Sequence, residues 1–233
     1  QPEDTDLGRR KQGRIDHSSN PDHPLVQLWS YDSHYARTFG MHPYFLCFDP
    51  ATERWERWEV FAGDQFGTYV TEQTTRISFG DPTKDVEETF RHRQWESVRN
   101  LAPVVRCNFH GDYLLGSWRD QDALRLLEVL REPTAYPRFD RYWFVPGPNS
   151  NGYARWVLSQ AGVGVDLDPR MVGKDWYGPL GLGAGLSPTR TGIHLDVLTF
   201  GATVGLLDGV EAHFLGATLG VDLWPPALKT PFG

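Results

Sequence analysis

The sequence lacks both a long apolar run and an excess of positive charge. Its 233 residues carry 23 Lys and Arg against 30 Asp and Glu, which gives a formal net charge of −7. Crossing a bilayer takes about 20 consecutive apolar residues, and affinity for nucleic acid comes largely from clustered Lys and Arg. We therefore expect no membrane span and no nucleic-acid partner. The 39% of hydrophobic residues is more than a disordered chain contains, so a folded protein is predicted.

Cysteine is scarce, and no motif with metal-ligand spacing is present. Cys47 and Cys107 are the only cysteines, and the eight histidines form neither HxH nor HExxH. Zinc sites are usually marked by such spacings, so we predict no metal ion and no cofactor. Each cysteine lies in a short apolar run, which leaves open a disulfide between neighbouring strands or two buried free thiols. His194 and His213 alternate with apolar neighbours, and we interpret them as surface or structurally hydrogen-bonded residues.

Aromatic residues are abundant, at 13% of the chain, alongside 24 Gly and 17 Pro. This mixture is typical of short strands joined by many turns. Residues 1–24 are polar and are predicted to form an extended arm, residues 25–190 the main core, and residues 191–233 a β-meander with a Pro-rich tail packed on the same domain. The predicted fold class is α+β: a mainly antiparallel sheet with a few packed helices and a C-terminal β-meander.

Two segments have helical spacing of their apolar residues. The first is Gln121–Glu132, for which Ser117 or Asp120 would be the N-cap. The second is Ser150–Ala161, which Gly162 would end. The glycine-rich stretch GPLGLGAGLSP lacks the G-K-[ST] of a phosphate loop, and a surface loop is predicted there.

The runs PYFLCF and RWERWEVF are predicted to pair as a hairpin through the turn DPAT. If Phe48 stands opposite Glu53, the register places Glu59 opposite His42 on the same face of the sheet. His42 begins its strand, where a strand end can present an imidazole ring to a site. Glu59 would then be the carboxylate that orients this ring.

The sequence Asn149-Ser150-Asn151 follows a Pro-Gly-Pro turn and opens the second helix. A helix N-terminus favours negative charge, so Ser150 is a candidate nucleophile and Asn149 or backbone N–H groups are candidate oxyanion donors. A nucleophilic serine needs a base, and His42 is the candidate for it. The structural alternative is that one of these three residues is simply an N-cap.

Three segments carry a resemblance to a known family: HPYFLCFDPATERWERWEVF, YWFVPGPNSNGYARWVL and GKDWYGP, followed by the meander that ends in VDLWPPALK. From about His42 to Leu228 the chain resembles an uncharacterised family, domain of unknown function 3750. More distantly, a His at a strand start before a helix opened by the nucleophile resembles the circularly permuted papain-like NlpC/P60 superfamily, which includes lecithin:retinol acyltransferase-like proteins. That resemblance implies a papain-like fold and a cysteine nucleophile, and here Ser150 stands at the cysteine position.

Two functions follow as expectations. One is a Ser-dependent hydrolase or acyltransferase that uses Ser150, His42 and Glu59, or a degenerate relative that has lost activity. The other is a non-catalytic structural subunit of a filament or shell, which would associate with itself or another protein through aromatic surfaces, the N-terminal arm and the Gly-rich C-terminal meander. A carbohydrate-binding module with exposed Trp platforms at Trp55, Trp58 or Trp143 is a third alternative. Because the chain starts at Gln1, which is compatible with a removed signal peptide, an extracellular, periplasmic or cell-envelope location is expected.

Overall fold

A computed structural model describes residues 22–32, 40–51, 54–58, 60–62, 77–79, 113–137, 143–176 and 182–232. Most of the predicted arm, together with Cys107 and Glu59, lies outside these residues, so the disulfide alternative stays open. Cys47 is fully buried in a strand. Within the described ranges, neither α-helix has the length and hydropathy that a membrane crossing requires.

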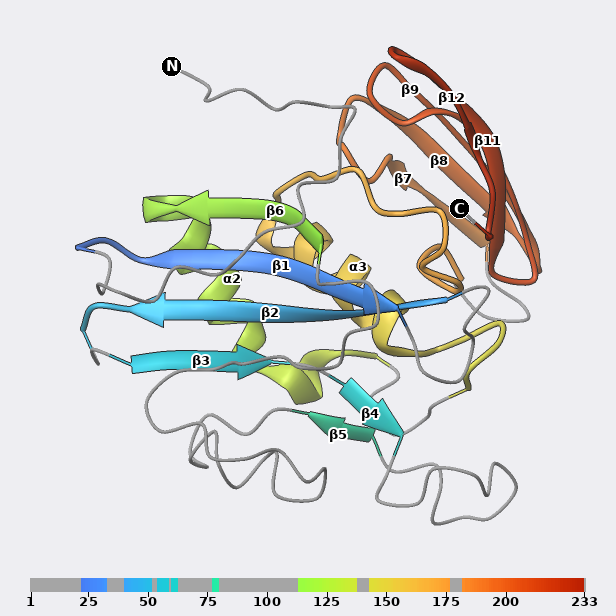
Figure 1. Cartoon of the computed structure of the whole chain (residues 1–233). Helices are drawn as coiled ribbons and strands as arrows, with labels where there is room; N and C mark the ends of the chain where they lie inside the picture. Colours follow the sequence, from blue (N-terminus) through green and yellow to red (C-terminus); the bar gives the residue numbers. More distant parts are fainter. Residues whose placement is uncertain are drawn as a thin grey trace.

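Four antiparallel strands form the first sheet, in the order β3-β2-β1-β6 (Figure 1). Strand β2 is buried at almost every position, because its run FLCF is apolar without interruption. A separate two-stranded ribbon pairs β4 with β5. The bounds are Leu25–Asp32 for β1, Met41–Asp49 for β2, Arg54–Trp58 for β3, Val60–Ala62 for β4, Ile77–Phe79 for β5 and Tyr113–Arg119 for β6.

Two helices cover one face of the four-stranded sheet (Figure 1). Helix α2 spans Asp120–Leu130 and α3 spans Ser150–Ala161, so both predicted helices are confirmed. Gly162 ends α3 in the left-handed conformation, with φ of 69°. The predicted cap of α2 is wrong: its N-cap is Arg119, without a side-chain bond, because β6 runs directly into the helix. A short 3-10 helix follows at Pro133–Ala135.

The core between the helices and the four-stranded sheet is built from apolar side chains. Each helix presents residues at spacings of three and four to the strands. The members with the least exposed area in the helices are Ala123, Leu126, Leu127, Leu130, Ala154, Val157 and Leu158, and those in the strands are Val26, Leu28, Phe45, Cys47 and Trp58. Burial of Trp58 in this core removes it as a sugar-binding platform. The side chain of Trp55 is not among those described.

The hairpin between β2 and β3 is present, but its register differs from the prediction by two residues. Phe48 stands opposite Trp55 and not Glu53, and Asp49 pairs with Arg54. The reason is that Asp49 stays in the strand, where its Oδ1 accepts the Ala51 N–H at 2.9 Å and its Oδ2 accepts from Arg131 Nη2 at 2.9 Å. The turn therefore begins one residue later than the prediction placed it.

Six antiparallel strands form a second sheet in the order β12-β11-β10-β9-β8-β7, which confirms the predicted meander (Figure 1). The prediction of a loop at residues 182–186 is wrong, because LGAGL pairs with β8 as an edge strand. The Pro-rich tail supplies the other edge, as its missing N–H groups require. The bounds are Leu182–Leu186 for β7, Gly192–Val197 for β8, Phe200–Gly205 for β9, Gly209–Phe214 for β10, Ala217–Leu223 for β11 and Pro226–Lys229 for β12.

The two faces of the six-stranded sheet have the opposite of the usual polarity. Buried and exposed positions alternate strictly along β8 and β10, as in GVEAHF. The buried residues are mostly polar or glycine, and the exposed ones are mostly apolar. Rows of paired residues on the exposed face are Ile193, Val204, Val210, Val221 and Leu228, then Leu195, Ala202, Ala212 and Leu219, then Val197, Phe200, Phe214 and Ala217. We call this surface the outer face.

A close backbone contact joins the six-stranded sheet to the segment that follows α3. Gly173 N donates to Gly216 O at 2.7 Å. Both glycines have positive φ, 83° and 82°. A Cβ on Gly216 would lie 2.7 Å from Pro146 O, in the turn before α3. The sheet is thus fixed against the same turn and loop that surround the N-terminus of α3.

Candidate active site

The turn before α3 is held by the side chain of Asn149, which is the N-cap. Its Oδ1 accepts the backbone N–H groups of Asn151 and Gly152 at 3.0 and 3.1 Å. Its Nδ2 donates to Phe144 O and Val172 O, both at 2.9 Å. The structural alternative considered above, that one of residues 149–151 is an N-cap, is therefore confirmed for Asn149. Because both amide protons are already bound to carbonyl oxygens, the oxyanion role considered for this side chain falls to backbone N–H groups.

The structure brings Ser150 and His42 together, although 108 residues separate them. Ser150 Oγ lies 3.2 Å from His42 Nδ1. Ser150 is the first residue of α3 and is 5% exposed, while His42 is the second residue of β2 and is half-buried. Tyr31 stands directly opposite His42 in the β1–β2 ladder, with ring centroids 5.1 Å apart. The predicted pair thus lies within hydrogen-bond reach.

The N-terminus of α3 gives this pair a positive electrostatic environment. No acidic residue occupies the first turn. The capping oxygen of Asn149 accepts the N–H groups of Asn151 and Gly152 and leaves the N–H of Ser150 without an acceptor among the described residues. An unbound N–H at a helix N-terminus can stabilise an anion beside the hydroxyl. This is the electrostatic requirement of a site that forms an oxyanion.

The third predicted member, Glu59, is outside the described residues, and the register assumed for it, with Phe48 opposite Glu53, is wrong. The β2–β3 ladder runs as Phe45 with Trp58 and Phe48 with Trp55. The ladder ends at the pair of Phe45 with Trp58, and position 61 pairs with Ser78 in the separate β4–β5 ribbon. The prediction of an orienting carboxylate at Glu59 therefore loses its geometric basis, and the role itself stays a prediction.

Apolar side chains lie on the turn that leads into Ser150. Trp143 N donates to Pro148 O at 2.7 Å and closes this turn. Trp143 and Val145 are 61% and 45% exposed. The ring of Trp176 lies 3.2 Å from the place where a Cβ on Gly147 would stand, so the turn follows the Trp176 ring closely. A substrate at Ser150 would meet an apolar approach on this side.

A second group of polar residues lies on the buried face of the six-stranded sheet, and sequence reasoning missed it. Lys174 Nζ contacts Asp175 Oδ2 at 2.5 Å and Glu211 Oε2 at 3.3 Å, and Lys229 Nζ contacts Glu211 Oε1 at 2.8 Å. Burial alone would lower the pKa of Lys174, but Asp175 and Glu211 raise it above its ordinary value, so the ammonium stays charged. Burial likewise opposes ionisation of Asp175, yet Lys174 holds the pKa of this carboxyl below its usual range. The sequence signal that could have revealed this group is the strict alternation of polar and apolar residues along β8 and β10.

Residues 24–176 match the model of a family described as Protein of unknown function (DUF3750), and the chain belongs to this family. The matched segment contains the four-stranded sheet, both α-helices, His42 and Ser150. The six-stranded sheet lies beyond its end. No curated protein and no solved structure gives a significant match to the chain.

Proposed function

We propose that this protein is a serine-dependent acyl hydrolase or acyltransferase, with Ser150 as the nucleophile and His42 as the general base. The observation that carries the proposal is the 3.2 Å contact between Ser150 Oγ and His42 Nδ1 at the N-terminus of α3. A serine hydroxyl is a weak nucleophile unless a base accepts its proton during attack. The contact supplies such a base, and the helix supplies a positive end for the developing charge.

The proposed reaction has two stages, acylation of Ser150 and then deacylation. Ser150 Oγ forms a bond to the carbonyl carbon of an ester or amide while its proton passes to His42 Nδ1. The carbonyl oxygen becomes an oxyanion, which the N–H of Ser150 would stabilise. Collapse breaks the bond to the leaving alcohol or amine, which takes the proton from His42. Water, or an acceptor alcohol or amine, then attacks the acyl-serine ester and gives its proton to His42. The bond between the acyl carbon and Ser150 Oγ breaks, Oγ takes the proton back from His42, and the acid or the transferred acyl product leaves.

The order of the elements supports a permuted papain-like arrangement for this site. His42 lies on a strand early in the chain, and Ser150 opens a later helix packed against that strand. Serine in place of cysteine makes the site depend fully on its base. The apolar residues Trp143 and Val145 favour an acyl group with an apolar substituent. Secretion or envelope association stays a prediction from the sequence.

Labelling by a fluorophosphonate probe tests the nucleophile. We expect the wild type to be labelled and Ser150→Ala to be unlabelled. The matched control is Ser159→Ala, which removes an exposed hydroxyl from the other end of the same helix and should be labelled like the wild type. Equal labelling of the wild type and Ser150→Ala would contradict the proposal.

The variant Ser150→Cys tests the environment independently of serine reactivity. A thiol at a helix N-terminus beside an imidazole has a lowered pKa and reacts faster with alkylating agents. We expect iodoacetamide to modify the introduced thiol faster than Cys47, which is fully buried, with the site assigned by peptide mass mapping. Reaction of the introduced thiol no faster than that of a free thiol in a short peptide would contradict a poised site.

A second candidate function is self-association through the outer face of the six-stranded sheet. Its exposed side chains include Leu182 at 81%, Leu228 at 79% and Phe200 at 60%. The three rows of paired residues on this face contain only aliphatic and aromatic side chains. Monomeric proteins rarely expose a contiguous apolar surface larger than a few hundred Å².

We infer that the occupant of the outer face is a second copy of this chain. Two sheets can stack face to face about 10 Å apart, and a two-fold axis makes one apolar face complementary to itself. Because the rows carry no charge, two chains of net charge −7 can meet there without placing like charges in contact. This agrees with the expectation of an assembly subunit, but it uses the meander and does not require the arm.

Light scattering after size exclusion tests this association. We expect a dimer or larger species for the wild type and a monomer for the double variant Leu195→Lys/Leu219→Lys. Leu124→Lys places the same charge on an exposed apolar position of α2 and should leave the mass unchanged. A wild type that is monomeric at all concentrations, or that floats with neutral lipid vesicles, would contradict self-association.

A further inference from the structure

We propose that Asp175, His194 and His213 bind a divalent transition-metal ion, with Zn²⁺ the best match to the ligand set. Two imidazoles and one carboxylate are a common set for zinc, with water or another oxygen as the fourth ligand. This site is separate from the Ser150–His42 pair. It would join the family-matched part of the chain to the six-stranded sheet.

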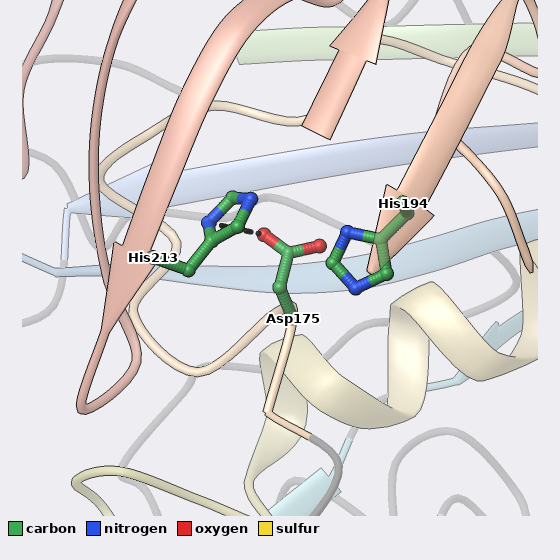
Figure 2. Close-up of side chains that lie close together, drawn as sticks. All are labelled: Asp175, His194 and His213. Carbon is green, nitrogen blue, oxygen red and sulfur yellow. Dashed lines mark ion pairs between the residues drawn. The ribbon is translucent and has the colours of Figure 1, made fainter. Parts of the chain in front are cut away.

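The three side chains converge from separate elements (Figure 2). Asp175 belongs to the segment after α3, His194 to β8 and His213 to β10. One ligand atom from each lies within 4.8 Å of the others, and His213 Nδ1 is 3.3 Å from Asp175 Oδ2. Each residue is at most 5% exposed. A modest contraction of these distances would bring all three atoms to coordination distance from one ion.

The first independent sign of a ligand is an orphaned oxygen on Asp175. This carboxylate is 4% exposed, and Figure 2 shows it between the two imidazole rings. Its Oδ2 binds Lys174, whereas its Oδ1 is buried and accepts no hydrogen bond from any described residue. Leaving a charged oxygen buried without a partner is costly. A cation between the rings would supply the missing partner.

The second sign is that the Nε2 atom of each ring already has a hydrogen-bond partner. His194 Nε2 is hydrogen-bonded to Asp196 Oδ2, and His213 Nε2 lies 2.9 Å from Thr203 Oγ1, with Glu211 Oε2 farther away at 3.6 Å. In metal sites the ligating imidazole usually donates its other N–H to a carboxylate or carbonyl, which fixes the ring and raises its basicity. His194 has such a carboxylate, and in both rings the partner is on Nε2, so Nδ1 is the nitrogen that would face an ion.

Threonine hydroxyls contact the same Nδ1 atoms. Thr203 Oγ1 lies 2.7 Å from His194 Nδ1, and Thr218 Oγ1 lies 3.2 Å from His213 Nδ1. A hydroxyl rotates and can donate or accept, so these contacts bind the rings without fixing a proton on Nδ1. Ion binding would replace both contacts, and the hydroxyls would then turn toward other acceptors in the network.

The strand register explains how these residues meet. Across the buried face, His194 pairs with Thr203 and Thr203 with Glu211. The next row places Asp196 beside Gly201 and Gly201 beside His213. A Cβ on Gly201 would lie 2.0 Å from Asp196 Oδ1, so only glycine leaves room for this carboxylate. The alternation of the strands therefore builds the group, and no short sequence motif can show it.

The test uses the full chain, stripped of metal by chelator and then loaded with ZnCl₂ or CoCl₂. We expect one tightly bound ion per chain after dialysis, measured by elemental mass spectrometry, and the visible absorption of four-coordinate Co²⁺. Bound Zn²⁺ should also raise the melting temperature, because it binds only the folded chain. A wild type that retains no Zn²⁺ and gives no Co²⁺ absorption would overturn the proposal.

Variants locate the ion. His194→Gln and His213→Gln should each weaken Co²⁺ binding by about tenfold or more. The control His42→Gln removes a histidine outside the group and should bind Co²⁺ like the wild type. Circular dichroism identifies variants that fold. If folded His194→Gln and His213→Gln retain the wild-type affinity and spectrum, the ion binds elsewhere and the assignment is wrong.

Discussion

The two large sheets of this protein bury opposite kinds of side chain. The four-stranded sheet turns apolar side chains toward two helices and forms an apolar core. The six-stranded sheet turns histidine, carboxylate and lysine side chains inward and leaves its aliphatic and aromatic side chains outside. The first arrangement is stabilised by burial of apolar area. The second depends on buried ion pairs, and it leaves an apolar surface for another molecule.

The two regions therefore differ in what stabilises them and in what they are proposed to bind. Apolar packing holds α3 against β2 and so fixes Ser150 beside His42. The polar interior of the six-stranded sheet gains little from the hydrophobic effect, and a buried ion pair is weak evidence for stability because desolvation offsets attraction. We therefore propose that the role of this sheet is to bind another molecule or an ion. The outer face and the Asp175–His194–His213 group are the two features that fit this description.

The largest expected effect comes from breaking the buried ion pairs. Lys174→Met leaves Asp175 and Glu211 without their shared ammonium, and removing one partner of a buried ion pair costs about 3–5 kcal/mol. Chemical denaturation followed by fluorescence measures the free energy of unfolding. The exposed pair of Arg125 with Asp122 is the control, and Asp122→Ala should cost less than about 1 kcal/mol. An equal loss of unfolding free energy in the two variants would show that the buried ion pairs matter no more than the exposed one.

The next effect compares leucines from the two sheets. Leu126 is fully buried in the apolar core, so Leu126→Ala should lower the free energy of unfolding by about 2–5 kcal/mol. Leu195 on the outer face is 51% exposed, and Leu195→Ala should change the stability of the monomer by about 0.5 kcal/mol or less. Denaturation at low protein concentration measures both. A large loss for Leu195→Ala under these conditions would mean that the outer face packs within the monomer.

The smallest effect concerns Asp49 at the hairpin of the first sheet. Burial alone would raise the pKa of this carboxyl, but the hydrogen bonds from Arg131 and the Ala51 N–H lower it below its ordinary value. A lowered pKa in the folded state stabilises the protein above the unfolded pKa, and this contribution is lost as the pH falls through the folded pKa. Asp49→Asn keeps the acceptor for Ala51 and removes the charge. It should cost about 1 kcal/mol at pH 7 and almost nothing near pH 2. The same cost at both pH values would show that the charge has no part in it.

Local patterns predicted the elements of this fold well. The helical spacing of Tyr153, Trp156 and Val157 and the glycine at position 162 indicated the bounds of α3. These bounds were predicted correctly because they depend on residues close in sequence. The proximity of Ser150 and His42 was expected from their places at a helix start and a strand start and from the resemblance to the permuted papain-like superfamily, and the contact is present. The catalytic roles of the two residues stay a proposal.

Three predictions failed because contacts distant in sequence decide the structure at those places. The hairpin register was set by Arg131, which binds Asp49 from 82 residues away. Residues 182–186 form a strand only because β8 offers an edge. The alternation in GVEAHF was visible, but alternation alone does not say which face turns inward, so the convergence of His194 and His213 on Asp175 was missed.

The most direct test of the account is the site of acylation by p-nitrophenyl acetate. Trypsin cleavage after Arg141 and Arg155 gives a peptide, residues 142–155, in which Ser150 is the only serine. The account predicts an acetyl group on Ser150 in the wild type, none on this peptide in Ser150→Ala, and acetylation slowed by about a hundredfold or more in His42→Gln. Acetylation elsewhere on the chain with Ser150 unmodified, or at an equal rate in His42→Gln, would contradict it.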